Sequence, residues 1–269
     1  INDLSSACNN FHWSNHMDNP KLSVIIPLFA RAGAITHLID EVLPALETQG
    51  FYSVNTEPLR IQLERYEQEN FLILYHRDIQ TELIIVTDKC VHPETRNCCL
   101  QINIGLKKAK GEVFCLLQQD VVADADTIAT MTETVLANPN LMLWANVYKQ
   151  RYPGDLDPMY WVGERRQNEA WFLITANREK LVEMGGVEER FARYWGVEDV
   201  EFLDRAKKIF DVQYSDMVRG VHLWHPEHPI ETKGGDNFAI YAELLENPNR
   251  VGNEGREWGI QYTGERDDY

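Results

Sequence analysis

Apolar runs and stretches of helical periodicity alternate along most of this chain. The runs have the length of strands and suit strands that are buried on both faces of a sheet. Between them, apolar residues recur every three or four positions, which predicts helices that pack on the sheet. The predicted strands cover residues 22–27, 83–86, 113–117, 141–148 and 171–175, and the predicted helices cover residues 35–46, 100–109, 128–135 and 178–184. This alternation predicts an α/β fold with a mostly parallel central sheet flanked by helices.

A helix that starts near residue 198 and runs to about residue 210 carries the first candidate for chemistry. Its apolar stripe includes Phe202 and Leu203, and Asp199 lies three residues before one and four before the other. A carboxylate on this stripe, near a helix start where the macrodipole favours its ionised form, suits a general base. Equally, Glu198 and Asp199 could serve only to stabilise the helix N-terminus. The remaining charged residues are mostly expected to face solvent: Glu201, Asp204, Arg205, Lys207 and Lys208.

The pattern divides the chain into one large domain with two short ends. Residues 1–20 are polar and lack periodicity, which predicts an arm, whereas residues 21–260 form the domain and residues 261–269 a tail. Within the domain, Pro44 is expected to kink the first helix, and Asp124 or Asp126 to cap the helix near residue 128. Residues 48–80 contain a charged helical piece and a short apolar run, 71–75, that suits a strand. Residues 149–170 are expected to form a long aromatic and cationic loop.

Composition narrows the choice of partners. A chain of 269 residues that is 44% hydrophobic can bury a large core without disulfides. Its formal charge of -16 argues against a nucleic-acid backbone or an anionic membrane surface as the main partner. An anionic ligand must therefore be bound by a local device, such as a metal ion or a few arginines.

The cysteines and the hydropathy bear on the compartment. Five cysteines without metal-finger spacing favour a reducing compartment, and no apolar run reaches the length of a membrane span. The cytoplasm is therefore the expected location. The lumen of the secretory pathway is the alternative if an N-terminal anchor precedes Ile1.

Polar residues that could bind a ligand follow the predicted strands. Asp88 and Asp120 each come after a strand, at the carboxyl edge where open α/β sheets bind ligands. His222 and His225 are three residues apart, and one histidine together with Asp120, diphosphate oxygens and water would suit Mn²⁺ or Mg²⁺. The alternative for Asp88 is a solvated turn, and the alternative for His225 is packing against Trp224 or a hydrogen bond within a loop.

Several of these segments resemble, in the same order, the family 2 glycosyltransferases of GT-A fold. The second half also resembles the galactosyltransferase and chondroitin-polymerase group, whose Trp-Gly-x-Glu-Asp motif is similar to residues 195–199. The resemblance covers about residues 20–260 and is strongest over residues 185–226. It implies a Rossmann-like sheet in which a nucleotide-sugar half and an acceptor half form one domain. The segments that carry it are residues 22–29, 82–88, 103–105, 109–121, 185–202 and 222–226.

The resemblance also implies roles for individual residues. Asp88 would hydrogen-bond the nucleotide base, commonly uracil, and Asp120 would take the second acidic position of an Asp-x-Asp motif and bind the metal. His225, or failing it His222, would complete the metal site. Asp199 would be the catalytic base, assisted by Glu198. The other expected donor-binding residues are Pro27, Phe29, Arg31, Asn103, Gln118 and Gln119, and the expected acceptor-binding residues are Trp195, Trp161 and Glu198.

Departures from the family pattern concern the donor site. Gln118 stands where the first Asp of the motif is expected, so it can hydrogen-bond a ribose but brings no charge. The span from Asp88 to Asn103 is shorter than in the family, and residues 48–80 are longer. Aspartate rather than asparagine at position 199 favours inversion by direct displacement.

The expected function is that of an inverting glycosyltransferase. It would transfer a sugar from a nucleotide-diphosphate sugar, most simply a UDP-sugar, to a hydroxyl of a glycan or another acceptor. One alternative is a catalytically silent nucleotide-sugar or glycan-binding protein of the same fold. Another is a sugar-1-phosphate nucleotidyltransferase, which would need a Gly-rich phosphate loop after the first strand, where residues 27–33 match poorly. The sequence specifies neither the acceptor nor the oligomeric state.

Overall fold

The computed structural model of the chain describes most of the domain predicted from the sequence. The described residues are 20–28, 38–48, 52–53, 69–72, 74–75, 79–87, 91, 95, 97–124, 126–156, 159–160, 171–226, 235–247 and 249–262. Phe29, Arg31, Asp88 and Trp161 lie outside them, as do the charged helical piece within residues 48–80 and nearly all of the predicted arm and tail.

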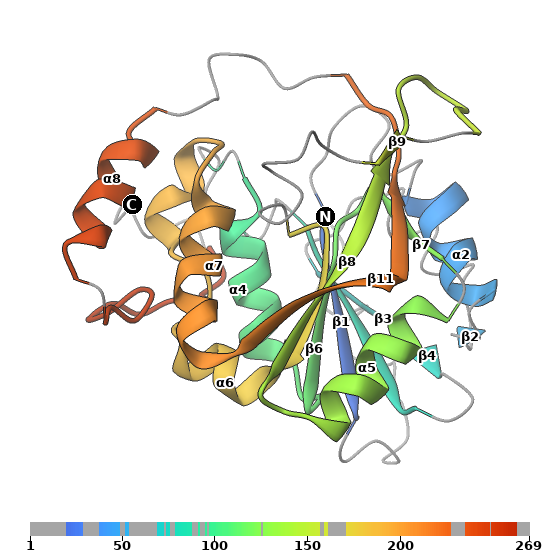
Figure 1. Ribbon diagram of the computed structural model, residues 1–269, viewed down its shortest axis with the longest axis horizontal. Helices are drawn as coiled ribbons and strands as arrows, with labels where there is room; N and C mark the ends of the chain where they lie inside the picture. The colour runs from blue at the N-terminus through green and yellow to red at the C-terminus, as the bar shows by residue number, and fades with distance from the viewer. Residues whose placement is uncertain are drawn as a thin grey trace, which may run out of the picture.

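A mixed sheet forms the centre of the molecule (Figure 1). Its strands follow the order β3-β5-β1-β6-β10-β8-β11-β7, and β9 pairs with β8. Strands β2 and β4 pair separately. The bounds are β1 Leu22–Leu28, β2 Tyr52–Ser53, β3 Glu69–Leu72, β4 Leu74–Tyr75, β5 Thr81–Thr87, β6 Val113–Leu117, β7 Val121–Ala123, β8 Leu141–Lys149, β9 Met159–Tyr160, β10 Leu173–Asn177 and β11 Asp211–His222.

The sheet is less parallel than the sequence suggested. Only the pairs β1–β5, β1–β6 and β8–β11 are parallel among the described pairings of the large sheet, and β10 runs antiparallel to both of its neighbours. A buried strand has the same apolar pattern in either direction, so the pattern could not reveal this reversal. The expected α/β class and the expected flanking helices are confirmed.

Helices cover both faces of the sheet. Helices α4, α6 and α7 lie on one side of the sheet and α2 and α5 on the other (Figure 1). Apolar residues from α4, α6 and α7 pack with Ile25 and Phe114, whereas those from α2 and α5 pack with Val24 and Cys115. Neighbouring strand residues thus alternate between two cores. The bounds are α2 Leu43–Thr48, preceded by a π-helical turn η2 Leu38–Val42, α4 Cys99–Lys108, α5 Thr127–Ala137, α6 Arg178–Glu183, a 3-10 turn η4 Glu189–Arg193, α7 Glu198–Ile209 and α8 Asn237–Leu245.

Local expectations were met unevenly. Pro44 lies where η2 gives way to α2, consistent with the predicted irregularity. The predicted capping of α5 is wrong: Asp126 occupies the N-cap position, but its φ of 62° is left-handed and its side chain makes no capping hydrogen bond. Asp124 contributes its backbone carbonyl, which accepts from Thr127. Two apolar pieces near residues 212 and 220 belong to the single long strand β11, which shifts register between Ser215 and Arg219.

Strand directions bring several element ends to one edge of the sheet, here called the carboxyl edge. Strands β1, β5, β6, β8 and β11 all run toward it. In sequence, helix α4 connects the parallel strands β5 and β6. Helix α7 packs on β11, and only Phe210 separates the two elements in sequence. Each helix therefore runs antiparallel to the strand that follows it, so α4 and α7 both start at the carboxyl edge.

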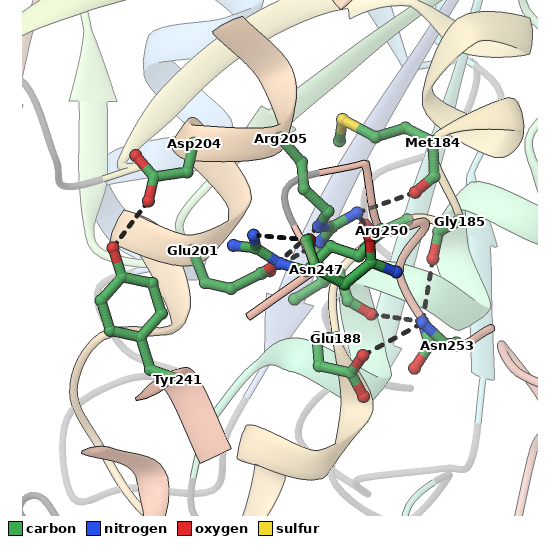
Figure 2. A network of polar contacts seen from close by, with 12 residues as sticks. Met184, Gly185, Glu188, Glu201, Asp204, Arg205, Tyr241, Asn247, Arg250 and Asn253 are labelled. Atoms are coloured by element: carbon green, nitrogen blue, oxygen red, sulfur yellow. Dashed lines mark hydrogen bonds and ion pairs between the residues drawn. The ribbon is translucent and has the colours of Figure 1, made fainter. Parts of the chain in front are cut away.

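A buried ion network contradicts one expectation for α7. Glu201 and Arg205 were expected to face solvent, yet each is only 1% exposed. Glu201 accepts from Arg205 Nε at 2.7 Å and Nη2 at 2.8 Å, and from Arg250 Nε at 3.0 Å (Figure 2). Arg205 Nη1 also donates to the carbonyls of Met184 and Gly186. The expectation is wrong for these two residues, because they belong to the buried side of α7, where another part of the chain covers them.

That covering is the segment 249–262, which follows α8. Asn253 donates its amide hydrogens to the carbonyls of Gly185 and Val187 and donates its backbone N–H to Glu188 (Figure 2). Farther along, Lys107 lies 3.7 Å from the ring centroid of Trp258. The segment therefore fastens α7 and α4 together. None of the helices in the described part of the chain has the length and apolar character of a bilayer span.

Candidate active site

Asp120, His222 and His225 meet at the carboxyl edge. Asp120 ends a tight turn after β6, in which Val121 N donates to Gln118 O. The short strand β7 then pairs antiparallel with the end of β11, so that His222 lies opposite Val121. Asp120 Oδ2 is 3.7 Å from His222 Nε2 and 3.6 Å from His225 Nε2. Potential ligand atoms of all three residues lie within 4.8 Å of one another.

The surroundings prepare both imidazoles to act as ligands. Nδ1 of His225 lies 2.7 Å from the carbonyl oxygen of Pro226, which can only accept, so Nδ1 is the donor, and the neutral form of this ring has its Nε2 lone pair on the side of Asp120. Burial lowers the pKa of His222, against the opposing effect of the Asp120 carboxylate. A neutral imidazole is the form that binds a metal.

The three side chains fit a divalent cation. For metal–ligand bonds of about 2.1 Å, two ligands of one octahedral ion are about 3.0 Å apart when they are neighbours and about 4.2 Å apart when they are opposite. The two separations from Asp120 Oδ2, 3.7 and 3.6 Å, lie between these values, so small side-chain movements would bring the three groups to ligand positions. Three protein ligands would leave positions for oxygens of a bound diphosphate or water.

A second group of acids lies at the start of α7. Glu198 is 5% exposed, and its Oε2 accepts from Gly196 N at 2.6 Å. Burial, followed by the neighbouring charge of Asp199, raises the pKa of Glu198 to about 8. Asp199 is half-buried, and its Oδ1 accepts from Val200 N at 2.9 Å. Glu198 is therefore the more buried of the two carboxyl groups, and Asp199 keeps partial access to solvent.

A short chain of contacts connects the two groups. Gln118, two residues before Asp120, donates to Cys98 Sγ at 3.4 Å. The adjacent Asn97 donates to the carbonyl of Tyr194 at 2.6 Å, in the turn that precedes Asp199. The candidate metal ligands and the acids of α7 therefore share the carboxyl edge. Asn97 and Cys98 were not singled out from the sequence, although an asparagine just before an apolar helical segment is a known helix-start signal.

The other predicted donor and acceptor residues are placed as follows. Pro27 lies within β1, opposite Val86 of β5. Gln119 is buried beside Asp120, and Trp195 is half-buried. The side-chain amide of Asn103, on α4, is buried. It donates to Val187 O and Glu189 Oε1 and accepts from Val187 N, so in this structure it holds the loop between α6 and η4.

Glu198 makes the stability of the protein depend on pH. Because its pKa is about 8 in the folded state against an ordinary value of 4.5, the folded protein keeps a proton that the unfolded chain releases. This contribution is complete below the ordinary value and is lost as the pH rises toward 8, at up to about 1.4 kcal/mol per pH unit. Denaturant titrations across this range should show a shallower decline for Glu198→Gln than for the wild type. Equal slopes would contradict the assignment.

Comparison with known proteins identifies the fold. The sequence matches no protein-family description and no curated protein. Solved structures do match: S. aureus TarS 1-349 aligns with a TM-score of 0.53 at 14% identity, covering 84% of this chain and 64% of that one. The catalytic domain of Drosophila beta1,4galactosyltransferase 7, in complex with xylobiose, aligns with a TM-score of 0.53 at 13% identity, covering 87% and 82%.

A third structure, GalNAc-T7 with UDP, GalNAc and Mn²⁺, aligns with a TM-score of 0.52 at 14% identity and covers 85% of this chain and 48% of that one. The chain thus spans less than two thirds of TarS 1-349 and about half of GalNAc-T7. At these identities the likeness establishes the fold alone. The chain has the GT-A-like α/β fold of these glycosyltransferases, as its sequence predicted.

Proposed function

We propose that this chain is a glycosyltransferase that transfers a sugar from a UDP-sugar to a hydroxyl of a glycan or another acceptor, with inversion at the anomeric carbon. Asp199 is the base in this proposal. Asp120, His222 and His225 would hold a divalent cation, which would neutralise the charge of the donor diphosphate. Gln118 and Gln119 lie on the donor side, and Glu198 and Trp195 on the acceptor side.

One observation carries the proposal: the three candidate ligands gather within 4.8 Å at the carboxyl edge, where the acidic start of α7 also lies. Open α/β sheets bind ligands outside the carboxyl ends of their strands. With a net charge of -16, the protein needs a local positive centre to hold an anionic donor.

The chain's own groups account for the proton transfer. Asp199 accepts the proton of the acceptor hydroxyl while the oxygen of that hydroxyl forms a bond to the anomeric carbon. The bond from that carbon to the diphosphate oxygen breaks, and its electron pair leaves with the nucleoside diphosphate. The N-terminus of α7 favours the ionised form of Asp199. Glu198, with its pKa raised to about 8, is protonated at neutral pH and leaves the base role to Asp199.

The ligand set bears on the choice of cation. When bound, the cation would neutralise the charge that develops on the leaving diphosphate. Mg²⁺ is bound almost entirely through oxygen ligands, and two of the three candidate ligands are imidazole nitrogens, so Mn²⁺ is the better match of the two expected cations. The contents of two similar structures support UDP and Mn²⁺: GalNAc-T7 with UDP, GalNAc and Mn²⁺, and TarS 1-349 with UDP-GlcNAc.

Calorimetry with UDP, with and without Mn²⁺, tests the cation site. UDP is expected to bind the wild type more tightly with Mn²⁺, and Asp120→Asn is expected to weaken this Mn²⁺-dependent binding by about 10- to 100-fold. Asp124→Asn is the matched control, because Asp124 follows β7 and lies outside the three-residue cluster. UDP binding that is equal with and without Mn²⁺ would contradict the cation assignment.

A screen of nucleotide sugars for slow hydrolysis then identifies the donor. Mn²⁺-dependent release of UDP from one sugar nucleotide is the expected result. Binding without any turnover would favour the catalytically silent alternative. Release of pyrophosphate from a nucleoside triphosphate and a sugar 1-phosphate would instead identify a nucleotidyltransferase.

A further inference from the structure

The turn that leads into α7 has an unfavourable backbone conformation. Val197, the N-cap residue of α7, has φ 65° and ψ -5°, and Gly196 before it has φ 114°. Glycine adopts positive φ freely, but a β-branched residue such as valine is strained there. Strain of this kind persists only where the surrounding structure imposes it. Contacts from outside α7 must therefore hold this turn.

Asn97 provides the first of these contacts. It is completely buried just before α4, and its Nδ2 donates to the carbonyls of Phe191 and Tyr194, each at 2.6 Å. Its Oδ1 accepts from Cys99 N at 3.0 Å, which fixes the side chain on the start of α4. The amide thus ties the turn to the helix that also contacts Gln118 through Cys98.

Asn237 provides the second contact, from the first turn of α8. It is also completely buried, and its Nδ2 donates to the carbonyls of Tyr194 at 2.9 Å, Gly196 at 3.1 Å and Phe191 at 3.3 Å. Gly235 lies so close to the ring of Tyr194 that a Cβ there would come within 2.3 Å of it. Asn97 and Asn237, which are 140 residues apart in sequence, therefore donate to the same two carbonyls, those of Phe191 and Tyr194. These hydrogen bonds are called the grip below.

The direction of the acids depends on this grip. Glu198 and Asp199 follow Val197 directly, so a change of φ at Val197 re-aims both carboxyl groups. The hydrogen bond from Gly196 N to Glu198 Oε2 exists only while the turn keeps its shape. A displacement of about 1 Å at a reacting group can lower the rate about 100-fold.

We infer that Asn97 and Asn237 are positioning residues that hold the strained turn at Tyr194–Val197 and thereby aim Asp199 at the acceptor. This inference rests on the proposed function for its catalytic consequence. The grip itself is a structural statement that can be tested without any substrate.

Hydrogen–deuterium exchange of the backbone amides of residues 194–203 tests the grip. Asn97→Ala and Asn237→Ala are each expected to accelerate exchange there by at least about fivefold. Adding Val197→Gly to Asn237→Ala is expected to reverse most of this change, because glycine needs no outside contact to keep a positive φ. If Asn237→Ala does not fold, Asn237→Ser retains one donor and should show a smaller acceleration.

Turnover of the donor tests the consequence. For Asn237→Ala, kcat is expected to fall by about 10- to 100-fold while KM for the nucleotide sugar stays within about twofold. The Val197→Gly double variant should recover at least about fivefold of the lost kcat. When kcat is expressed per folded molecule, a residue that served stability alone would show no loss of kcat, so a loss that Val197→Gly restores identifies the strained turn as its cause.

Asn253→Gly is the matched control. Asn253 is another buried asparagine, but its side-chain amide donates to the carbonyls of Gly185 and Val187 and accepts from Glu189 N, outside residues 194–203, and its own φ of 55° suits glycine. It should lose stability without altering exchange over residues 194–203 or kcat.

The two measurements separate the inference from the proposed function. Unchanged exchange over residues 194–203 in both Asn97→Ala and Asn237→Ala would overturn the grip, whatever the activity. Faster exchange with undiminished kcat would overturn the positioning role. A wild type that turns over no nucleotide sugar would reject the proposed function, and the exchange data would still decide on the grip.

Discussion

Asp199→Asn is expected to abolish sugar transfer while leaving UDP and Mn²⁺ binding intact. Asparagine keeps the size and the acceptor oxygen that Val200 N contacts, but it cannot take a proton at neutral pH. General-base catalysis contributes about 10²- to 10⁴-fold to a rate, so kcat should fall by that factor. Steady-state kinetics with the donor found by hydrolysis screening, together with calorimetry of UDP, measures both quantities.

Asp204→Asn is the matched control for this variant. Asp204 lies on the same helix and accepts from the hydroxyl of Tyr241 at 2.6 Å, away from the Trp195 turn. The same chemical change there should leave kcat nearly unaltered. If Asp199→Asn kept more than about a tenth of the wild-type kcat, Asp199 would not be the base.

Glu201→Ala is expected to cause the largest loss of stability. It removes the carboxylate that Arg205 and Arg250 share and leaves two arginines whose side chains are only 1% and 3% exposed. Breaking a buried ion pair from one side costs about 3–5 kcal/mol, because the remaining charge stays buried without compensation. The midpoint of urea denaturation should therefore fall sharply, with unfolding beginning where α7 meets segment 249–262.

Glu243→Ala controls for the loss of an acid in general. Glu243 pairs with Arg190 at 2.8 Å, but its side chain is 66% exposed. An exposed pair of this kind contributes little, so the urea midpoint should stay close to that of the wild type. A similar small change for Glu201→Ala would show that the network of Figure 2 does not support the fold.

Comparison of single elements shows which parts of the fold could be predicted from the sequence. The strand predicted at residues 113–117 matches β6, and the helix predicted to run to about residue 210 matches α7 closely. Both depend on a period that the backbone geometry of one element imposes on its own residues. The direction of β10 was not accessible, because a strand covered on both faces has no polar side to mark its orientation.

The candidate site divides in the same way. Asp120, His222 and His225 were grouped from their positions after strand ends and from the chemistry of metal ligands, and the structure brings them together. Their catalytic use stays a prediction, as do the roles of Phe29, Arg31, Asp88 and Trp161. Asn97 and Asn237 were missed because their partners are backbone carbonyls of a distant turn, and every residue has a backbone carbonyl, so the sequence does not show which ones will accept these hydrogen bonds.

By itself, the sequence determined the α/β class, the position of most strands and helices, and the acids and histidines that reach the carboxyl edge. Only the tertiary structure decided the mixed direction of the sheet, the burial of Glu201 and Arg205, and the grip on the turn before Asp199. The physical reason is the sequence separation of the residues that interact. Periodicity records which side of an element turns inward, but what covers a side or holds a turn comes from segments far away in the chain.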